Sequence, residues 1–208
     1  MLCSKIVCIG RNYPSHAVEM KAGEPLEPVL FLKPSSSLIG NGEPILLPKG
    51  IGRVDHEAEL AVIIGKGGKG IRAEDALSHV GKLAVFNDVT ARDFQSAAKA
   101  KGLPWTLSKG IDTFSPMSDP RPMSEIDDPQ ELDIELRVND VARQRGNTSQ
   151  MIFSVAELIE YISRWMRLDE GDIIATGTPG GVGPIRPGDT VEIEVPGVGE
   201  LLNPVRSL

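Results

Sequence analysis

The stretch Val54-Asp55-His56-Glu57-Ala58-Glu59-Leu60-Ala61-Val62-Ile63-Ile64-Gly65 organises the whole chain. Its second half is an apolar run that ends at a glycine, a pattern that predicts a buried β-strand. Side chains two residues apart on a strand point to the same face. Glu57 and Glu59 therefore stand in one row, with Asp55 before them if the strand reaches that far. At about 3.3 Å per residue, the two glutamates lie roughly 6–7 Å apart along the strand.

This row of carboxylates has two interpretations. Like charges this close repel each other, and carboxylates that lead into an apolar strand are costly to bury. A hard divalent cation such as Mg²⁺, Mn²⁺ or Ca²⁺ removes both costs, because carboxylate oxygens are its preferred ligands. The other interpretation is an exposed strand face whose charges are solvated. Taken alone, the stretch leaves both interpretations open.

The composition predicts one acidic domain. The 208 residues, taken as a single domain 1–208, are enough to bury a substantial core. The net charge is −7 and the 22 lysines and arginines form no basic run, which argues against a nucleic-acid partner. No apolar run approaches the ~18–20 residues of a membrane span, and the first residues lack a signal pattern. We therefore expect a cytoplasmic protein without a membrane partner.

Secondary-structure patterns predict a mixed α/β, mainly β fold. The chain has many short apolar runs, 22 glycines and 16 prolines, with three or four short helices between the runs. This pattern favours rolled mixed β-sheets over an alternating βαβ order. Cys3 and Cys8 lie in one predicted strand and face opposite sides, so they are poorly placed to form a disulfide.

Two helix starts are predicted from capping-box spacing. Ser154 and Glu157 precede the most regular apolar helix face in the chain. Thr90 and Asp93 have the same spacing and predict a second helix that stops near Gly102.

A strand in the second half of the chain provides a contrast to the acidic row. Residues 131–138 alternate between apolar and polar side chains without a fault, which predicts a half-buried strand whose acids are solvated. Asn139-Asp140 then turns the chain into residues 141–145 as a hairpin.

Several polar groups are candidates for acid–base chemistry. Pro14 can open a short helix on which His16 and Glu19 are neighbours. A carboxylate beside an imidazole raises the pKa of the imidazole and orients it as a general base, although the same spacing fits a surface contact. A strand-to-helix junction places Asp88, Arg92 and Gln95 near one another, and Asp88 could equally be a turn residue.

Two further candidates are basic or glycine-rich. Lys109 stands beside a glycine and could contact an anion or simply be solvated. The loop Gly177–Gly183 is too rich in glycine for a mere connection, because glycines let the backbone approach a ligand closely and offer free N–H groups.

Six motifs follow one another along the chain: 9–13 with His16 and Glu19, 31–37, 55–60, 87–93 with Gln95, 108–114, and 171–183. In order and spacing they resemble the fumarylacetoacetate hydrolase family, specifically its short acylpyruvate hydrolase-like branch. The resemblance covers residues 5 to 205. It departs from the family pattern at residues 117–122, where a Gly-Pro pair is expected and Met117-Ser118-Asp119-Pro120 stands. In the resemblance this segment borders a site-facing loop that affects substrate choice.

The resemblance implies a role for each candidate. It implies a β-roll fold, usually in a homodimer, with one Mg²⁺ or Mn²⁺ per subunit. The implied metal ligands are Glu57, Glu59 and Asp88. The implied polar groups of the active site are Lys109 and Gln95, and the implied acid–base dyad, on a mobile segment that covers the site, is His16 with Glu19. Arg11, Arg92 and Thr178 are assigned to substrate binding.

The chemistry that fits this set is cleavage of a carbon–carbon bond in a small anionic 2,4-dioxo acid, such as acetylpyruvate or fumarylpyruvate. His16 and Glu19 would activate water, and the products would be pyruvate and a carboxylic acid. The enolate that leaves needs a positive partner, which a divalent cation and Lys109 supply. Decarboxylation or keto–enol tautomerisation of oxaloacetate on the same site is the alternative. The dyad favours hydrolysis, because simple decarboxylation needs no water-activating base. A binding module without catalysis is a third reading, and no ligand or base is missing to favour it.

Overall fold

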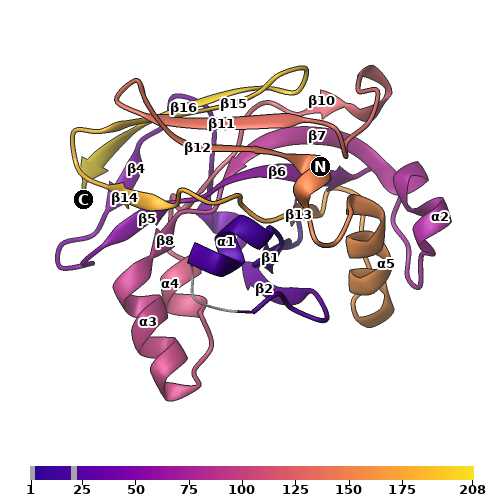
Figure 1. Ribbon diagram of the computed structural model, residues 1–208, viewed down its shortest axis with the longest axis horizontal. Helices are drawn as coiled ribbons and strands as arrows, with labels where there is room; N and C mark the ends of the chain where they lie inside the picture. Colours follow the sequence, from indigo (N-terminus) through magenta and orange to yellow (C-terminus); the bar gives the residue numbers. More distant parts are fainter. Residues whose placement is uncertain (1–2, 20–22) are drawn as a thin grey trace.

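The apolar run after Glu59 forms a strand in the middle of a six-stranded sheet. The structure is a computed structural model that describes residues 3–19 and 23–208 (Figure 1). The order of strands in this sheet is β10-β7-β6-β13-β1-β2. They span Arg121–Pro122, Val80–Asn87, Ala58–Ile64, Ile173–Ala175, Ile6–Gly10 and Val29–Lys33. β1 pairs with β13 in parallel, and β6 pairs with both of its neighbours in antiparallel fashion.

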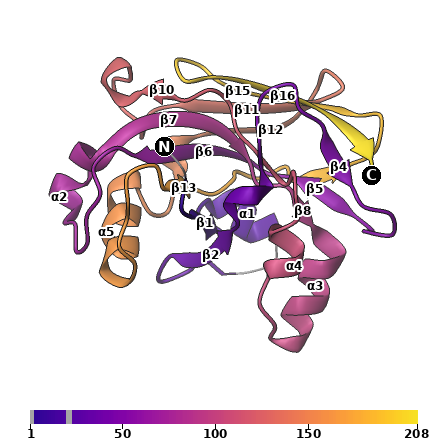
Figure 2. The ribbon, with the colours of Figure 1, turned by 180° about the vertical axis from the view of Figure 1, so that it is seen from behind.

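A five-stranded sheet packs over one face of this sheet, as both ribbon views show (Figure 2). Its order is β12-β11-β15-β16-β4, with bounds Val141–Asn147, Asp133–Val138, Thr190–Val195, Gly199–Ser207 and Ile45–Leu47. A three-stranded sheet joins β14 (Gly183–Ile185), β5 (Val54–His56) and β8 (Thr90–Ala91), and β3 (Leu38–Ile39) pairs with β9 (Ser115–Pro116). The prediction of rolled, mixed β-sheets with few helices is confirmed.

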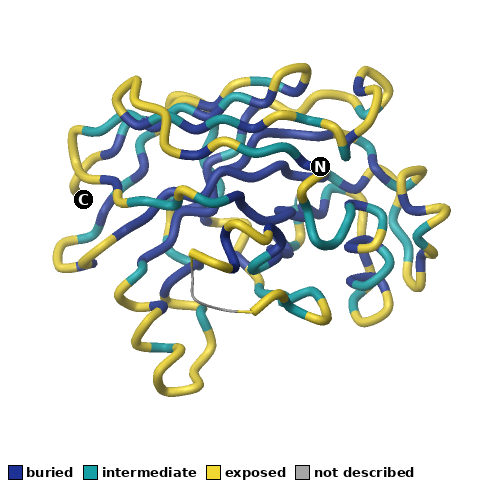
Figure 3. The backbone as a smooth tube through the Cα atoms, viewed as in Figure 1, coloured by how far each residue is buried: buried dark blue, intermediate teal, exposed yellow. Residues whose placement is uncertain are grey.

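The central strands of the six-stranded sheet are buried, whereas β10 at one edge is exposed (Figure 3). Leu60 and Val62 belong to the large core shared with the five-stranded sheet. Ala61, between them, belongs to a smaller core on the opposite face. Strands covered on both sides read as unbroken apolar runs, which explains the sequence of β6. Glu59 is the second residue of this strand, so its carboxylate lies in the interior of the protein.

Five α-helices lie around the sheets in the described residues. They are α1 (Pro14–Glu19), α2 (Ala73–Ala76), α3 (Arg92–Lys101), α4 (Thr106–Lys109) and α5 (Val155–Trp165). The capping box of α5 is confirmed, because Ser154 Oγ accepts from the Glu157 N–H while the Glu157 carboxylate accepts from the Ser154 N–H. α3 ends at Lys101 and is capped by Gly102, which adopts a left-handed conformation with φ of 63°.

The predicted capping box at Thr90 and Asp93 is wrong. α3 begins at Arg92, one residue later than that spacing implies, and its N-cap is Ala91. Thr90 is part of β8, where Asp55 of β5 pairs with it, so its backbone is extended. Its hydroxyl donates to the carbonyl of Asp88. The Asp93 carboxylate instead accepts from the Arg53 N–H.

The predicted hairpin is confirmed as β11 and β12. Asn139 and Asp140 form its turn with φ angles of 52° and 62°, which Asn and Asp tolerate better than most residues. Cys3 and Cys8 are both free, but the prediction that they face opposite sides of one strand is wrong. β1 begins at Ile6, so Cys3 precedes it, and Cys3 packs against the same small core that contains Cys8. No helix in residues 3–19 and 23–208 is both long and apolar enough to cross a membrane.

Candidate metal centre

The acidic row lies where the chain leaves the three-stranded sheet and enters the six-stranded sheet. β5 ends at His56 and β6 begins at Ala58, so Glu57 lies in the break between them. The Glu57 N–H donates to Asn87 Oδ1 at 3.0 Å, and the Asp88 N–H donates to the carbonyl of Glu57 at 2.9 Å. These bonds hold the end of β7 against the break, which brings a third carboxylate beside the first two.

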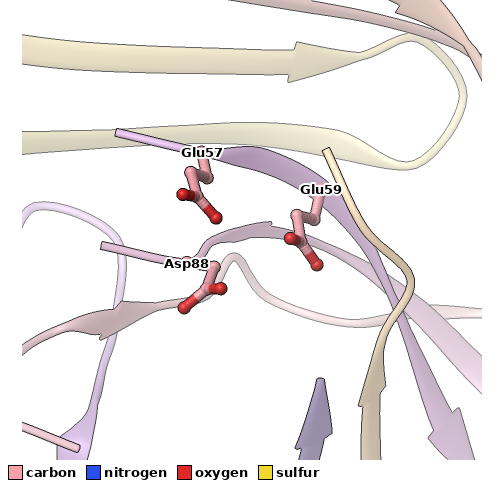
Figure 4. Close-up of side chains that lie close together, drawn as sticks. All are labelled: Glu57, Glu59 and Asp88. Carbon is pink, nitrogen blue, oxygen red and sulfur yellow. The ribbon is translucent and has the colours of Figure 1, made fainter. Parts of the chain in front are cut away.

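Glu57, Glu59 and Asp88 form one cluster (Figure 4). One ligand oxygen from each lies within 4.8 Å of the others. The three residues are only 4 %, 1 % and 1 % exposed. The solvated interpretation of Glu57 and Glu59 is therefore excluded, and we call these three residues the carboxylate triad.

Buried cations neutralise two members of the triad. Lys109 Nζ donates to Glu57 Oε2 at 2.9 Å and also to Asp88 Oδ2. Lys33 Nζ donates to Asp88 Oδ1 at 2.6 Å, and Arg92 donates to Glu57 Oε1 at 2.5 Å. Each oxygen of Glu57 and Asp88 thus has a positive partner, as buried carboxylates require.

Glu59 is the member that lacks such a partner among the described residues. Its Oε2 accepts only the Gly177 N–H, at 2.9 Å. Burial, and then the charges of Asp88 and Glu57, raise its pKa well above the ordinary value. The pKa of Glu57 goes the other way, because Lys109 and Arg92 outweigh burial and lower it. The pKa values of the two glutamates in this row are therefore shifted in opposite directions.

The triad fits a hard divalent cation. It supplies three carboxylates, the ligand type that Mg²⁺ and Mn²⁺ favour. A cation between them would also stabilise the ionised form of Glu59, which burial and the neighbouring carboxylates disfavour. Gly177 allows this arrangement, since its φ is 99° and a Cβ there would lie 2.7 Å from Asn12 Cβ.

A cavity that opens to solvent adjoins the triad. Its lining includes every predicted site residue except Glu19 and Asp88, namely Arg11, His16, Glu57, Glu59, Arg92, Gln95, Lys109 and Thr178. Arg11 has a φ of 60°, a left-handed conformation that non-glycine residues adopt seldom and that is enriched at functional sites. The separate motifs of the sequence thus meet at one place.

The predicted dyad is close but not hydrogen-bonded. His16 Nδ1 and Glu19 Oε2 are 3.6 Å apart, and Nδ1 is buried without a partner among the described residues. Glu19 instead accepts the Gly181 N–H at 3.1 Å, and Ser15 Oγ accepts the Gly180 N–H at 3.0 Å. α1 is thereby held against the glycine-rich loop.

The expected rise in the pKa of His16 does not occur. Burial lowers the pKa below its ordinary value, and this effect outweighs the opposing charges of Glu57 and Glu19. A neutral imidazole can accept a proton near pH 7.

Arg92 is largely engaged by protein groups. Besides Glu57, it donates to Asp55 Oδ2 at 2.8 Å and to Gln95 Oε1 at 2.7 Å. Asp55, which the sequence places beside the site, thus holds the guanidinium that holds Glu57. The predicted substrate contact of Arg92 stays a prediction.

Sequence reasoning missed three residues that support the site. Lys33 is 1 % exposed and donates to Asp88. The sequence feature that could have identified it is its position at the end of the apolar run of β2. Gln144 reaches Thr178 from β12. Trp105 lines the cavity beside Lys99.

The effect of residues 117–122 on substrate choice stays a prediction, and none of these residues lines the cavity. Met117 follows β9 and bonds to the carbonyl of Ile39. Arg121 and Pro122 form β10 at the edge of the large sheet. The departure from the family motif therefore lies outside the cavity wall.

The chain is similar over nearly its whole length to known proteins. Residues 5–206 match the family model described as fumarylacetoacetate hydrolase C-terminal. The mitochondrial oxaloacetate tautomerase of Arabidopsis thaliana is 46 % identical over 198 residues, covering 95 % of this chain and 89 % of that protein. The structure of fumarylpyruvate hydrolase from Pseudomonas aeruginosa, in complex with Mn²⁺ and pyruvate, has a TM-score of 0.96 at 36 % identity. It covers 99 % of this chain and 91 % of that one.

A third similar protein carries another activity in its name. The 5-carboxymethyl-2-hydroxymuconate delta-isomerase of Mycobacterium smegmatis has a TM-score of 0.89 at 42 % identity, over 100 % of this chain and 80 % of that one. These matches confirm the resemblance that the six motifs indicated. They also name a tautomerase, a hydrolase and an isomerase among its relatives.

Proposed function

Because the chain belongs to the fumarylacetoacetate hydrolase family, we propose that it is an enzyme that moves protons on a small 2-oxo dicarboxylic acid. The reaction proposed first is keto–enol tautomerisation of oxaloacetate. The observation that carries the proposal is a buried imidazole, His16, in one cavity with Lys109 and two triad glutamates. The motifs alone favoured hydrolysis because of the dyad. We rank tautomerisation first because it needs only one base, and the 3.6 Å separation of His16 and Glu19 supports this order.

The carboxylate triad is proposed to hold Mg²⁺ or Mn²⁺. The Mn²⁺ in the name of the Pseudomonas structure supports this choice. When bound, such a cation supplies Lewis-acid polarisation of a carbonyl oxygen.

His16 and Lys109 have complementary roles in this proposal. The imidazole of His16 takes a proton from the carbon between the two carbonyl groups of the substrate. The proton returns to the enolate oxygen, so no atom is gained or lost. Burial lowers the pKa of Lys109, but Asp88 and Glu57 outweigh burial and raise it. Lys109 therefore stays charged and stabilises the developing enolate.

Positive charge at the cavity rim favours a dicarboxylate over a monocarboxylate. Arg11 and Lys99 both line the cavity. Burial and the nearby charge of Arg92 lower the pKa of Lys99, which shows that a positive charge is held there at a cost. A second substrate carboxylate would relieve that cost.

Hydrolysis of an acylpyruvate is the second candidate. It is favoured by the structural similarity to fumarylpyruvate hydrolase and by the short distance over which Glu19 would have to move to reach His16. Hydrolysis requires His16 to activate water, with Glu19 orienting the imidazole.

One assay series tests and ranks these reactions. Oxaloacetate tautomerisation, fumarylpyruvate cleavage and acetylpyruvate cleavage are measured side by side with Mg²⁺ or Mn²⁺, and again after chelation. We expect oxaloacetate to be turned over fastest, acetylpyruvate slowest, and chelation to stop every reaction. Faster cleavage of fumarylpyruvate would favour the second candidate. Full activity of the metal-free protein would overturn the proposed mechanism.

The homodimer is a separate proposal. It is supported by an apolar hollow on the outer face of the six-stranded sheet, lined in part by Leu38, Ile63, Met117 and Ile173. Apolar surfaces of this kind mark protein interfaces. Light scattering at micromolar concentration would contradict it by giving the monomer mass.

A further inference from the structure

Gln144 connects the five-stranded sheet to the cavity wall. It lies on β12, whose other side chains are exposed or half-buried, yet Gln144 itself is 1 % exposed. The pairing of β11 with β12 shifts between Leu136 and Arg137, so that Arg143 is left without an opposite residue. Such a bulge re-aims the next side chain. It turns Gln144 inward from an otherwise solvent-facing strand.

Every hydrogen-bonding position of the Gln144 amide is used. Its Oε1 accepts the Ala58 N–H at 3.0 Å and lies 2.9 Å from His56 Nδ1. Its Nε2 donates to the Pro179 carbonyl at 2.9 Å and to Thr178 Oγ1 at 2.7 Å. Gln144 therefore bridges the start of β6 and the glycine-rich loop.

Two backbone groups determine which way this amide faces. The Ala58 N–H can only donate, so the atom beside it is the amide oxygen. The Pro179 carbonyl can only accept, so the atom beside it is the amide nitrogen. It follows that His56 carries its proton on Nδ1, and that Thr178 Oγ1 is an acceptor toward Gln144.

This orientation decides what the Thr178 hydroxyl can do. Because the oxygen accepts from Gln144, its own hydrogen has to point elsewhere. In residues 3–19 and 23–208 the structure provides no acceptor for that hydrogen, while Thr178 lines the cavity. A hydroxyl hydrogen that faces a cavity is suited to an anionic oxygen of a ligand.

We propose that Gln144 is a positioning residue that fixes the Thr178 hydroxyl as a hydrogen-bond donor to a carboxylate of the substrate. The identity of that carboxylate rests on the proposed function; the direction of the hydroxyl does not. Gly181 supports the same arrangement, since a Cβ there would lie 2.2 Å from the carbonyl oxygen of Arg143. The bulge and the loop are therefore packed too closely to shift independently.

The test uses pyruvate, with Mn²⁺ present, as the probe. Binding is measured by calorimetry for the wild type, Gln144→Glu, Thr178→Val and the double variant. A carboxylate at position 144 accepts from Thr178, so it turns the hydroxyl hydrogen away from the cavity. We expect Gln144→Glu and Thr178→Val each to weaken pyruvate binding by roughly 10-fold or more, while Mn²⁺ binds with unchanged affinity.

The double variant separates positioning from a general effect on the fold. If Gln144 acts through Thr178, the two losses do not add, and Gln144→Glu weakens binding no further in a chain that already carries Thr178→Val. Thr178→Ser, which keeps the hydroxyl, should retain binding. Additive losses, or unchanged binding in Gln144→Glu, would overturn the proposal.

Two further measurements keep the test decisive. If Gln144→Glu does not fold, Gln144→Met replaces it in the same cycle, because it removes the donor without adding charge. Gln144→Met should weaken pyruvate binding less than Gln144→Glu does. It should cause no further loss of pyruvate binding in a chain that already carries Thr178→Val. If the wild type binds Mn²⁺ but not pyruvate, the proposed binding of a 2-oxo acid at this site fails; if it binds both and the cycle is additive, only the role of Gln144 fails.

Discussion

Two rows of acidic side chains in this protein have the same spacing, but one row is buried and the other is partly exposed to solvent. Glu57 and Glu59 enter β6 and are 4 % and 1 % exposed. Asp133 and Glu135 stand at the same spacing on β11, where the Glu135 side chain is 25 % exposed and pairs with Arg137 and Arg145. Period-two spacing fixes which face a side chain takes, whereas burial depends on what covers that face.

The two rows differ in burial because the two sheets differ in how many of their faces are covered by other parts of the protein. The six-stranded sheet has a core on each face, while the five-stranded sheet has one face toward solvent (Figure 3). Buried acids need fixed cations, and those at β6 come from three separate elements, as Lys33, Arg92 and Lys109. On β11, Glu135 pairs with two arginines of its own hairpin and Asp133 accepts from Asn147 Nδ2, and both acids are partly solvated.

The largest difference between the rows should appear in activity. Glu59→Gln removes a triad carboxylate, so we expect turnover with Mg²⁺ to fall by about 100-fold or more, since a catalytic metal contributes several kcal/mol. Glu135→Gln is the matched control on β11 and should keep wild-type turnover. Steady-state rates for oxaloacetate check both variants, and equal activity in the two would break the comparison.

A second difference should appear in stability. Lys109→Met leaves Glu57 and Asp88 short of a buried cation, which costs about 3 kcal/mol or more of the free energy of unfolding. Arg145→Met on the hairpin breaks an exposed pair and should change that free energy very little. Urea unfolding in the presence of a chelator measures both. Added Mg²⁺ should recover part of the loss in Lys109→Met, and equal effects of the two variants would contradict this account.

The smallest expected effect is a pH dependence of cation affinity. Burial and the charges of Asp88 and Glu57 raise the pKa of Glu59, so a cation has to displace its proton. The apparent affinity for Mn²⁺ should therefore rise with pH up to that raised pKa and level off above it. By the same linkage, the metal-free fold loses stability as the pH rises through the raised pKa.

Calorimetric titrations with Mn²⁺ at several pH values measure this dependence. Glu59→Gln is the control, because it has no proton to release at this position and should bind more weakly with a flatter pH profile. An affinity independent of pH in the wild type would show that Glu59 is already ionised.

Much of the site could be predicted because its residues carry local signals. The acids stand directly before an unbroken apolar run, which distinguishes them from the alternating acids of β11. Asp88 ends a strand and Gly177 begins a glycine-rich loop, so both were visible as candidates. The rolled mixed sheets followed from many short strands.

What could not be predicted depends on partners that are distant in the sequence. Lys33 is buried only because Asp88, 55 residues later, neutralises it. Gln144 turns inward only because of a bulge in β12. The direction of the pKa shift of His16 depends on the balance between burial and charge, which spacing alone does not contain.

The most direct test of the central claim is an anomalous difference map at the manganese absorption edge, from crystals grown with Mn²⁺ and pyruvate. The account predicts one strong peak per chain, within ligand distance of Glu57, Glu59 and Asp88, and none beside the acids of β11. A map with no peak between the three carboxylates, or with its peak at Glu135, would contradict it.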